Sequence, residues 1–147
     1  IRKKIKKQGL SDDAKTLNKM MIKLRNEKGR SAIADICIPI IKKSQNKYII
    51  IDGIRNIEEI KQFQKIGQVI SILITNTTER RMNFLIERGR KDAPLNKKTF
   101  EKRDENEINI GLDKVMKIAD IKINNNGLTK EEFKIKSKKI LLKLIEK

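Results

Sequence analysis

Histidine and tryptophan are absent from the 147-residue sequence, which contains a single cysteine and a single tyrosine. Without histidine, the chain cannot form a histidine-based catalytic triad or a histidine-rich zinc site. The lone cysteine, Cys37, excludes an intramolecular disulfide and is expected to be a small buried hydrophobic residue. The apolar runs are too short to span a membrane and no secretory signal sequence is visible. Because a single cysteine is also typical of intracellular proteins, we expect a cytoplasmic protein with no membrane partner.

Acidic residues are few relative to basic ones. The chain has 36 Lys and Arg residues against 19 Asp and Glu residues, which gives a net charge of +17. Such a charge is compatible with nucleic-acid binding, but the lysines are spread over every segment and aromatic residues make up only 3% of the chain. The codon usage of an AT-rich genome, which favours Lys, Ile and Asn, also explains the charge. A basic nucleic-acid-associated α/β module without catalysis therefore remains the alternative, and the less favoured one.

Arginine is scarce in this lysine-rich chain. Because Lys supplies most of the positive charge, an Arg indicates a position where the planar guanidinium, which can contact two oxygens at once, is required. The nine arginines are Arg2, Arg25, Arg30, Arg55, Arg80, Arg81, Arg88, Arg90 and Arg103. Several of them lie next to turn residues, where binding sites are common.

Short β-branched runs predict three strands, at residues 48–51, 69–75 and 121–123. The stretch YIIIDGIR places Asp52 and Gly53 directly after the first of them. In parallel sheets ligands bind beyond the carboxyl ends of the strands, so we expect Asp52 to serve a metal and Gly53 to turn the chain away. A simple strand-ending turn is the alternative for these two residues.

Apolar periodicity and capping residues predict helices between these strands. The expected capping residues are Ser11, Ser31, Asn56, Thr77 or Thr78, and Thr129, with Glu59 and Glu132 completing two capping boxes. The helix after Ser31 is expected to bury Ile36 and Ile40 and to bend or end at Pro39. Strands that alternate with helices, without a linker or repeat, predict a single α/β domain with a parallel sheet.

Five segments give the chain a more specific resemblance. They are IRKKIKKQGL, IIIDGIRNIEEIKQFQ, ERRMNFLIERGRKDAP, FEKRDENEINIG and ADIKINNNGLTKEEF, and together they cover nearly the whole sequence. In content and order they resemble the archaeal adenylate-kinase-like or dephospho-CoA-kinase-like P-loop nucleotide kinases. The resemblance implies a three-layer P-loop NTPase fold, a parallel sheet with helices on both faces and a small lid at about residues 88–108. It also implies ATP and Mg²⁺ as cofactors and phosphate transfer to a nucleotide or a CoA-type acceptor.

The sequence departs from that family at its start. No glycine is followed by Lys-Ser or Lys-Thr, so the Walker A loop G-x-x-x-x-G-K-[ST] is missing. The nearest approach, residues 28–31 (KGRS), lacks both the earlier glycine and a preceding strand. The resemblance therefore implies that residues 1–147 form an N-terminally incomplete kinase domain that lacks the first strand and the P-loop. We expect this chain to transfer no phosphate by itself.

The resemblance also assigns roles to individual residues. Arg2 and Arg55 match arginines that hold the phosphate of the acceptor. Asp52 matches the strand-end acid that orients magnesium through its waters, and Asn126 with Gly127 matches the turn beneath the nucleotide base.

Three further arginines fall in the expected lid. Arg88, Arg90 and Arg103 match lid arginines that close over the transferring phosphate and contribute to catalysis. Arg81 matches a family arginine whose role the resemblance leaves open. For the lid arginines the alternative is a solvated basic helix end that complements the helix dipole.

Overall fold

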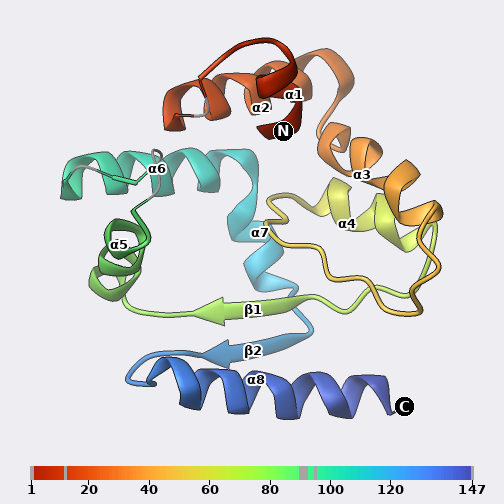
Figure 1. The fold of residues 1–147 in the computed structure, drawn as a ribbon, viewed down its shortest axis with the longest axis vertical. Coiled ribbons are helices and arrows are strands. Elements are labelled where there is room, and N and C mark those ends of the chain that lie inside the picture. The colour runs from red at the N-terminus through yellow and green to blue at the C-terminus, as the bar shows by residue number, and fades with distance from the viewer. Residues whose placement is uncertain (1, 12, 90–92, 95, 147) are drawn as a thin grey trace.

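The computed structural model describes residues 2–11, 13–89, 93–94 and 96–146, which form eight helices and two strands (Figure 1). In chain order the elements are α1 (Arg2–Lys7), α2 (Ala14–Lys28), α3 (Ala32–Lys42), α4 (Ile57–Gln64), β1 (Ile72–Thr75), α5 (Thr78–Glu87), α6 (Lys97–Ile110), α7 (Leu112–Lys117), β2 (Ile121–Asn124) and α8 (Lys130–Ile145). Among the described residues, no helix combines the length and the apolar character that a membrane crossing requires.

The sheet of the described residues consists of β1 and β2, which run parallel. Ile72 pairs with Ile121 and Thr75 pairs with Asn124. The connection between the strands contains α5, α6 and α7 (Figure 1), because parallel neighbours need a long crossover. The fold is therefore α/β with a small parallel sheet and many helices, and both later strands of the sequence prediction are confirmed.

The strand predicted at residues 48–51 is wrong. These residues are irregular and exposed, and the side chain of Ile50 is 84% exposed. Within the described chain, the backbone of residues 45–54 forms no hydrogen bond to another part of the backbone. A β-branched run becomes a strand only when a neighbour supplies the other half of the hydrogen-bond ladder, and no described strand does so here.

Three of the predicted helix caps are confirmed. The side chains of Asn56 and Thr77 accept hydrogen bonds from the amides of Glu59 (2.9 Å) and Arg80 (3.3 Å). At the start of α8, Thr129 and Glu132 form the predicted reciprocal capping box. At Asn56 the box is not reciprocal, because the Glu59 carboxylate accepts from the amide of Arg55 instead.

The two N-terminal caps are wrong, and α3 does not end at Pro39. Asp13, and not Ser11, caps α2 by accepting from the Thr16 amide at 2.9 Å. Ser31 precedes α3 without capping it, because its hydroxyl donates to the Asp35 carboxylate at 3.0 Å. Helix α3 continues through Pro39 to Lys42.

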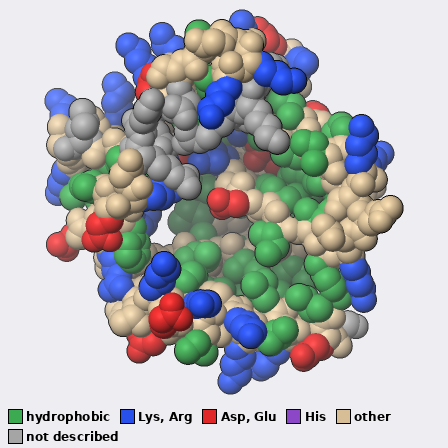
Figure 2. Space-filling model, viewed as in Figure 1, with side chains coloured by type: hydrophobic (Ala, Val, Ile, Leu, Met, Phe, Trp, Pro, Cys, Tyr) green, Lys and Arg blue, Asp and Glu red, His purple; other side chains and the backbone are tan. Residues whose placement is uncertain are grey.

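The buried core is small. One cluster joins the N-terminal helices through Ile5, Met20, Leu24 and Ala32. Ile36 and Ile40, which were expected to be buried on α3, are 38% and 71% exposed, and Cys37 is half-buried. Figure 2 shows a hollow in the middle of the molecular face, lined largely by hydrophobic side chains. The helix itself is present, but the predicted burial fails because these apolar side chains have too few packing partners in the described chain.

A carboxylate links the starts of the two strands. The Asp120 carboxylate accepts hydrogen bonds from the amide (2.7 Å) and the hydroxyl (2.6 Å) of Ser71. These bonds favour the ionised form and lower the pKa of Asp120 below its usual value of 3.8.

The lowered pKa predicts a pH-dependent contribution to folding. Because the folded pKa lies below the unfolded one, the bonds stabilise the fold above about pH 4 and lose their effect as pH falls through the folded value. Asp120→Asn is therefore expected to be less stable than wild type near neutral pH and equally stable in strong acid. Urea unfolding across this range measures the difference, and Asp113→Asn in α7 is the control. A difference that persists unchanged in acid contradicts the assignment.

Candidate functional site

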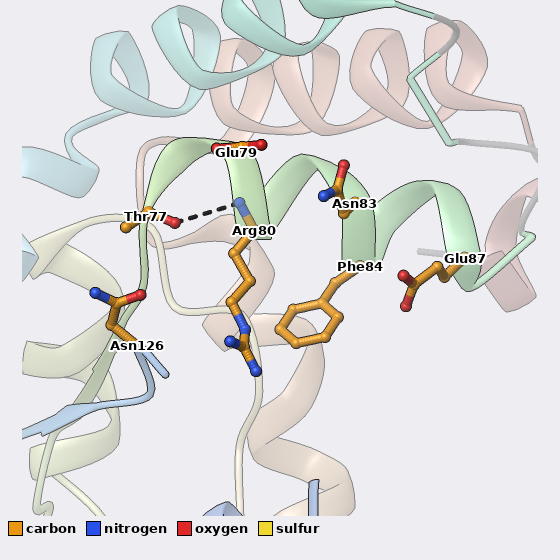
Figure 3. Close-up of a pocket in the computed structure, with 7 residues that line it drawn as sticks. All are labelled: Thr77, Glu79, Arg80, Asn83, Phe84, Glu87 and Asn126. Carbon is orange, nitrogen blue, oxygen red and sulfur yellow. Dashed lines mark hydrogen bonds between the residues drawn. The ribbon is translucent and has the colours of Figure 1, made fainter. Parts of the chain in front are cut away.

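A pocket of about 480 Å³ opens where both strands end (Figure 3). β1 ends at Thr75 and β2 ends at Asn124, and both carboxyl ends lie at the same edge of the sheet. The lining residues follow these ends or lie on α5: Thr77, Glu79, Arg80, Asn83, Phe84, Glu87 and Asn126. This is the edge at which open parallel sheets bind their ligands.

Arg80 and Phe84 form one wall of this pocket. The guanidinium of Arg80 lies 5.4 Å from the centre of the Phe84 ring, and its Nη2 atom donates to the carbonyl of Leu128. In Figure 3 both side chains extend from α5, and Arg80 is drawn between Phe84 and Asn126. The wall thus combines an aromatic face with a planar cation, and the Asn126 amide can donate or accept. Such a set suits a flat heteroaromatic group.

A second constellation consists of three arginines and two glutamates. The Glu59 carboxylate accepts from Arg25 Nη2 at 2.7 Å and from the Arg55 amide at 2.9 Å. The Glu107 carboxylate accepts from Arg55 Nη2 at 3.2 Å and lies 3.7 Å from Arg103 Nε. The network therefore connects α2, the turn before α4, α4 itself and α6.

Part of this network is buried and incompletely paired. The side chains of Arg25 and Glu59 are only 8% and 3% exposed. Even so, Nε and Nη1 of Arg25 and Nε of Arg55 have no hydrogen-bond partner among the described residues. The network joins three guanidinium groups and two carboxylates. Buried donors without partners are unfavourable, so an anion or a bound water would stabilise the network.

A second pocket, of about 430 Å³, adjoins Arg25 between α2 and α6. Four amide side chains, two isoleucines and two arginines line it, together with a glycine: Asn18, Ile22, Arg25, Asn26, Gly29, Arg30, Asn106, Asn109 and Ile110. The lining offers hydrogen-bond donors, acceptors and positive charge without a carboxylate. It therefore favours a neutral or anionic polar ligand over a cation.

The residue predicted to serve a metal and the residues predicted to bind the acceptor lie in different environments. Asp52 is exposed in the irregular segment before α4, and Arg55 is half-buried in the network. The described residues contain no group of three or more metal-ligating side chains, so any metal at Asp52 would need its other ligands from water or substrate. The backbone of Arg2 begins α1, but its side chain lies outside the described part of the structure.

The predicted lid arginines are not equivalent either. Arg103 is half-buried on α6 and belongs to the network through Glu107. Arg88 is exposed at the C-terminal cap of α5, and Arg90 lies outside the described residues. The predicted base-binding turn does reach a pocket, because Asn126 lines the one at the strand ends and Gly127 follows with φ of 76°.

Several residues of these sites were missed by sequence reasoning. Arg25, Arg80 and Phe84 carried no motif, although the scarcity of arginine pointed to the first two. For Glu59 the sequence did contain a signal, because an acidic residue stands next to Ile60 on a helix face that is apolar. In the structure both residues are buried on α4. Arg81 is bonded through both terminal nitrogens to Asp104 at 2.8 and 2.7 Å, which fastens α5 to α6.

Comparison with protein-family models gives no match. The UPF0200 protein of Sulfurisphaera tokodaii is 37% identical over 123 residues, which cover 84% of this chain and 68% of that protein. The UPF0200 protein of Methanoregula boonei is 33% identical over 132 residues, 89% of this chain and 72% of that protein. The UPF0200 protein of Thermococcus kodakarensis is 30% identical over an alignment that covers all of this chain and 82% of that protein. By these identities and the length of the matches, the chain belongs to the UPF0200 family of archaeal proteins.

Proposed function

We propose that the chain is the base-binding and acceptor-binding part of an ATP-dependent phosphotransferase of the nucleotide or dephospho-CoA kinase type. One observation carries the proposal: the carboxyl ends of both parallel strands open onto one pocket that contains Asn126. The sequence resemblance places the nucleotide base at this residue and Gly127. In this proposal the two-stranded sheet is part of a larger P-loop NTPase sheet.

The base of ATP would lie against Arg80 and Phe84. The aromatic ring and the guanidinium plane provide stacking surfaces, while Asn126 provides hydrogen bonds to the edge of the base. The contact of Arg80 with the Leu128 carbonyl holds the guanidinium in position before the ligand arrives. Such preorganisation reduces the entropic cost of binding.

The phosphate of the acceptor would be held at the arginine–glutamate network. Arg55 is the residue that the resemblance assigns to this role, together with Arg2. The unpaired nitrogens of Arg25 and Arg55 support an anion there. A phosphate is suitable because several of its oxygens can accept from the two guanidinium groups at once. Arg103 shares Glu107 with Arg55 and would respond to the same ligand.

The triphosphate and the metal fit this chain less well. The sequence contains no Walker A loop, and Asp52 is the single acid proposed to orient Mg²⁺ through water. In phosphoryl transfer the metal neutralises charge on the phosphates, while backbone amides and a lysine of the P-loop hold them. The residues present therefore suit the base and the acceptor, and the lid arginines Arg88, Arg90 and Arg103 would close over the phosphate. The triphosphate itself requires groups from outside this sequence.

The proposal predicts an activity that depends on an added P-loop. The 147-residue chain alone is expected to show no ATP turnover. A chimera with a strand and a G-x-x-x-x-G-K-[ST] loop placed before Ile1 is expected to bind Mg²⁺–ATP and to transfer phosphate. Isothermal titration and a coupled ADP assay, with nucleoside monophosphates and dephospho-CoA as acceptors, measure both steps.

A matched chimera in which the loop lysine is replaced by alanine is the control. In the active chimera, Asn126→Ala is expected to raise the KM for ATP, whereas Asn46→Ala, in an exposed irregular segment, is expected to leave it unchanged. Turnover by the chain alone would refute the P-loop requirement. A folded chimera that neither binds nor turns over ATP, but binds DNA with a steep salt dependence, would favour the nucleic-acid alternative.

A further inference from the structure

The two glutamates of the arginine–glutamate network hold their arginines differently. The Glu59 side chain is 3% exposed and accepts from Arg25 at 2.7 Å. The Glu107 side chain is 22% exposed and accepts from Arg55 at 3.2 Å. Hydrogen bonds between a guanidinium and a carboxylate are usually about 2.7–2.9 Å long, so the contact at Glu107 is the longer and weaker one. Glu59 is therefore a fixed partner, whereas Glu107 is a carboxylate that a ligand can replace.

Arg55 keeps its position without Glu107. Its amide donates to the Glu59 carboxylate at 2.9 Å, and its Nη1 atom donates to the Gly53 carbonyl at 2.7 Å. Its Nε atom has no hydrogen-bond partner among the described residues. Withdrawal of Glu107 from Nη2 would therefore leave the guanidinium anchored, with donors available for another anion.

A second arginine can receive the displaced carboxylate. Arg103 lies four residues before Glu107 on α6, and its Nε atom is 3.7 Å from the carboxylate. Residues four apart are neighbours on one face of a helix. A Glu107 side chain that leaves Arg55 would therefore keep a cation beside it without any change in the backbone of α6. This lowers the cost of the exchange, because no buried charge is left alone.

We propose that Glu107 is an exchangeable carboxylate, which is bonded to Arg55 until the phosphate of the acceptor binds and then moves to Arg103. The inference rests on the proposed acceptor site at Arg55 and adds how that site responds to its ligand. A phosphate monoester carries about 1.5–2 negative charges near pH 7 and three acceptor oxygens, so it displaces a single carboxylate from Arg55. Glu107 is thus a positioning residue, which orients Arg103 once the acceptor is bound.

Removing the charge of Glu107 is expected to strengthen phosphate binding, whereas the loss of a merely structural contact would weaken it or leave it unchanged. Glu107→Gln keeps the shape of the side chain and an oxygen that accepts from Arg55. We expect inorganic phosphate to bind Glu107→Gln about tenfold more tightly than the wild-type chain of 147 residues. NMR titration near pH 7, followed at the amides of residues 53–56, measures this affinity separately from binding to lysines elsewhere.

Two variants serve as controls for charge and for folding. Glu105→Gln removes the same charge from an exposed position on α6 and is expected to leave the phosphate affinity unchanged. Glu107→Asp keeps the charge on a side chain that is one methylene shorter, which draws the carboxylate back from Arg55. Its phosphate affinity is expected to lie between those of wild type and Glu107→Gln, and it provides the same test if the Gln variant does not fold.

The movement to Arg103 has its own measurement. The NMR signal of the Arg103 Nε–H group is expected to shift on addition of phosphate in wild type and to stay unchanged in Glu107→Gln. In the active P-loop chimera, Glu107→Gln is expected to lower the KM for the acceptor and also to lower kcat by about tenfold, because Arg103 is no longer positioned. A structural role alone would not lower both constants.

The outcomes separate this inference from the proposed function. Phosphate affinity that is equal or weaker in Glu107→Gln, or no detectable binding to either chain, would overturn the exchange. An active chimera in which Glu107→Gln raises the KM for the acceptor would overturn it as well and leave the proposed function standing. An inactive chimera, combined with tighter phosphate binding by Glu107→Gln, would refute the proposed function and support the exchange.

Discussion

Glu59→Ala is expected to lower the free energy of unfolding by about 3–5 kcal/mol, because it breaks a buried ion pair and leaves a buried cation alone. The Glu59 side chain is 3% exposed and accepts from Arg25 and from the amide of Arg55. Arg25 already has two unpaired nitrogens, so the variant would leave a guanidinium without any described partner. Marginal domain stability makes this loss a large fraction of the total. Urea denaturation near neutral pH measures it.

An exposed ion pair provides the control. Glu131 lies 3.6 Å from Lys134 on α8, and its side chain is 71% exposed. Glu131→Ala is expected to change the free energy of unfolding by less than about 1 kcal/mol. The double variant Arg25→Met with Glu59→Leu should recover much of the lost stability, since it removes both charges and keeps apolar volume. If Glu59→Ala and Glu131→Ala cost the same, the buried pair is not stabilising the N-terminal helices.

In the P-loop chimera, Arg88→Ala is expected to raise the activation free energy of phosphate transfer by roughly 2–4 kcal/mol, which lowers kcat about 30- to 900-fold. Arg88 ends α5 and is exposed, and it is followed by Gly89 with φ of 60°. In the proposed enzyme this exposed cation would reach the transferring phosphate only after the proposed lid closes, so its contribution would arise in the transition state. Arg88→Lys should recover the activity only in part, because an ammonium group lacks the planar fork.

The contrast with Arg55 makes this prediction specific. Arg55 is proposed to grip the acceptor before and during transfer, so Arg55→Ala should raise the KM for the acceptor with little change in kcat. Lys102→Ala, at an exposed position of α6, should affect neither constant. Steady-state kinetics with ATP and acceptor varied separately distinguish these cases. Nearly full kcat in Arg88→Ala would support a solvated helix end at this position.

Local sequence patterns predicted much of the secondary structure. Asn56, Thr77 and Thr129 cap the helices that were expected to follow them, because capping depends on a few neighbouring residues. The strand prediction for residues 48–51 was wrong for the opposite reason, because strand pairing depends on a second strand from a distant part of the chain. The predicted burial of Ile36 and Ile40 was wrong for a similar reason. Periodicity predicts an apolar helix face but does not show that another element packs against it.

For the candidate sites too, the sequence predicted single residues but not their partners from distant parts of the chain. Asn126 and Arg55 were predicted as site residues from the family resemblance, and both lie beside other polar groups in the structure. The partners of Arg55 could not be predicted, because Glu59 and Glu107 reach it through the turn before α4 and through α6. The pairing of Arg25 with Glu59 spans 34 residues and leaves no local pattern apart from a buried acid on an apolar helix face.

Gly111, at the corner between α6 and α7, lies beside the turn that carries Arg55. It has φ of 118°, and a Cβ atom at this position would lie 3.5 Å from the Asn56 Cβ and 3.7 Å from the Arg55 carbonyl oxygen. A side chain at this corner would therefore meet the turn next to the proposed phosphate grip. A rotation of α6 about this pivot would be transmitted to Arg55 at one end and to Asp104, which holds Arg81, along its length. If the proposed lid moves α6, we expect lid movement and acceptor binding at Arg55 to influence each other through this corner.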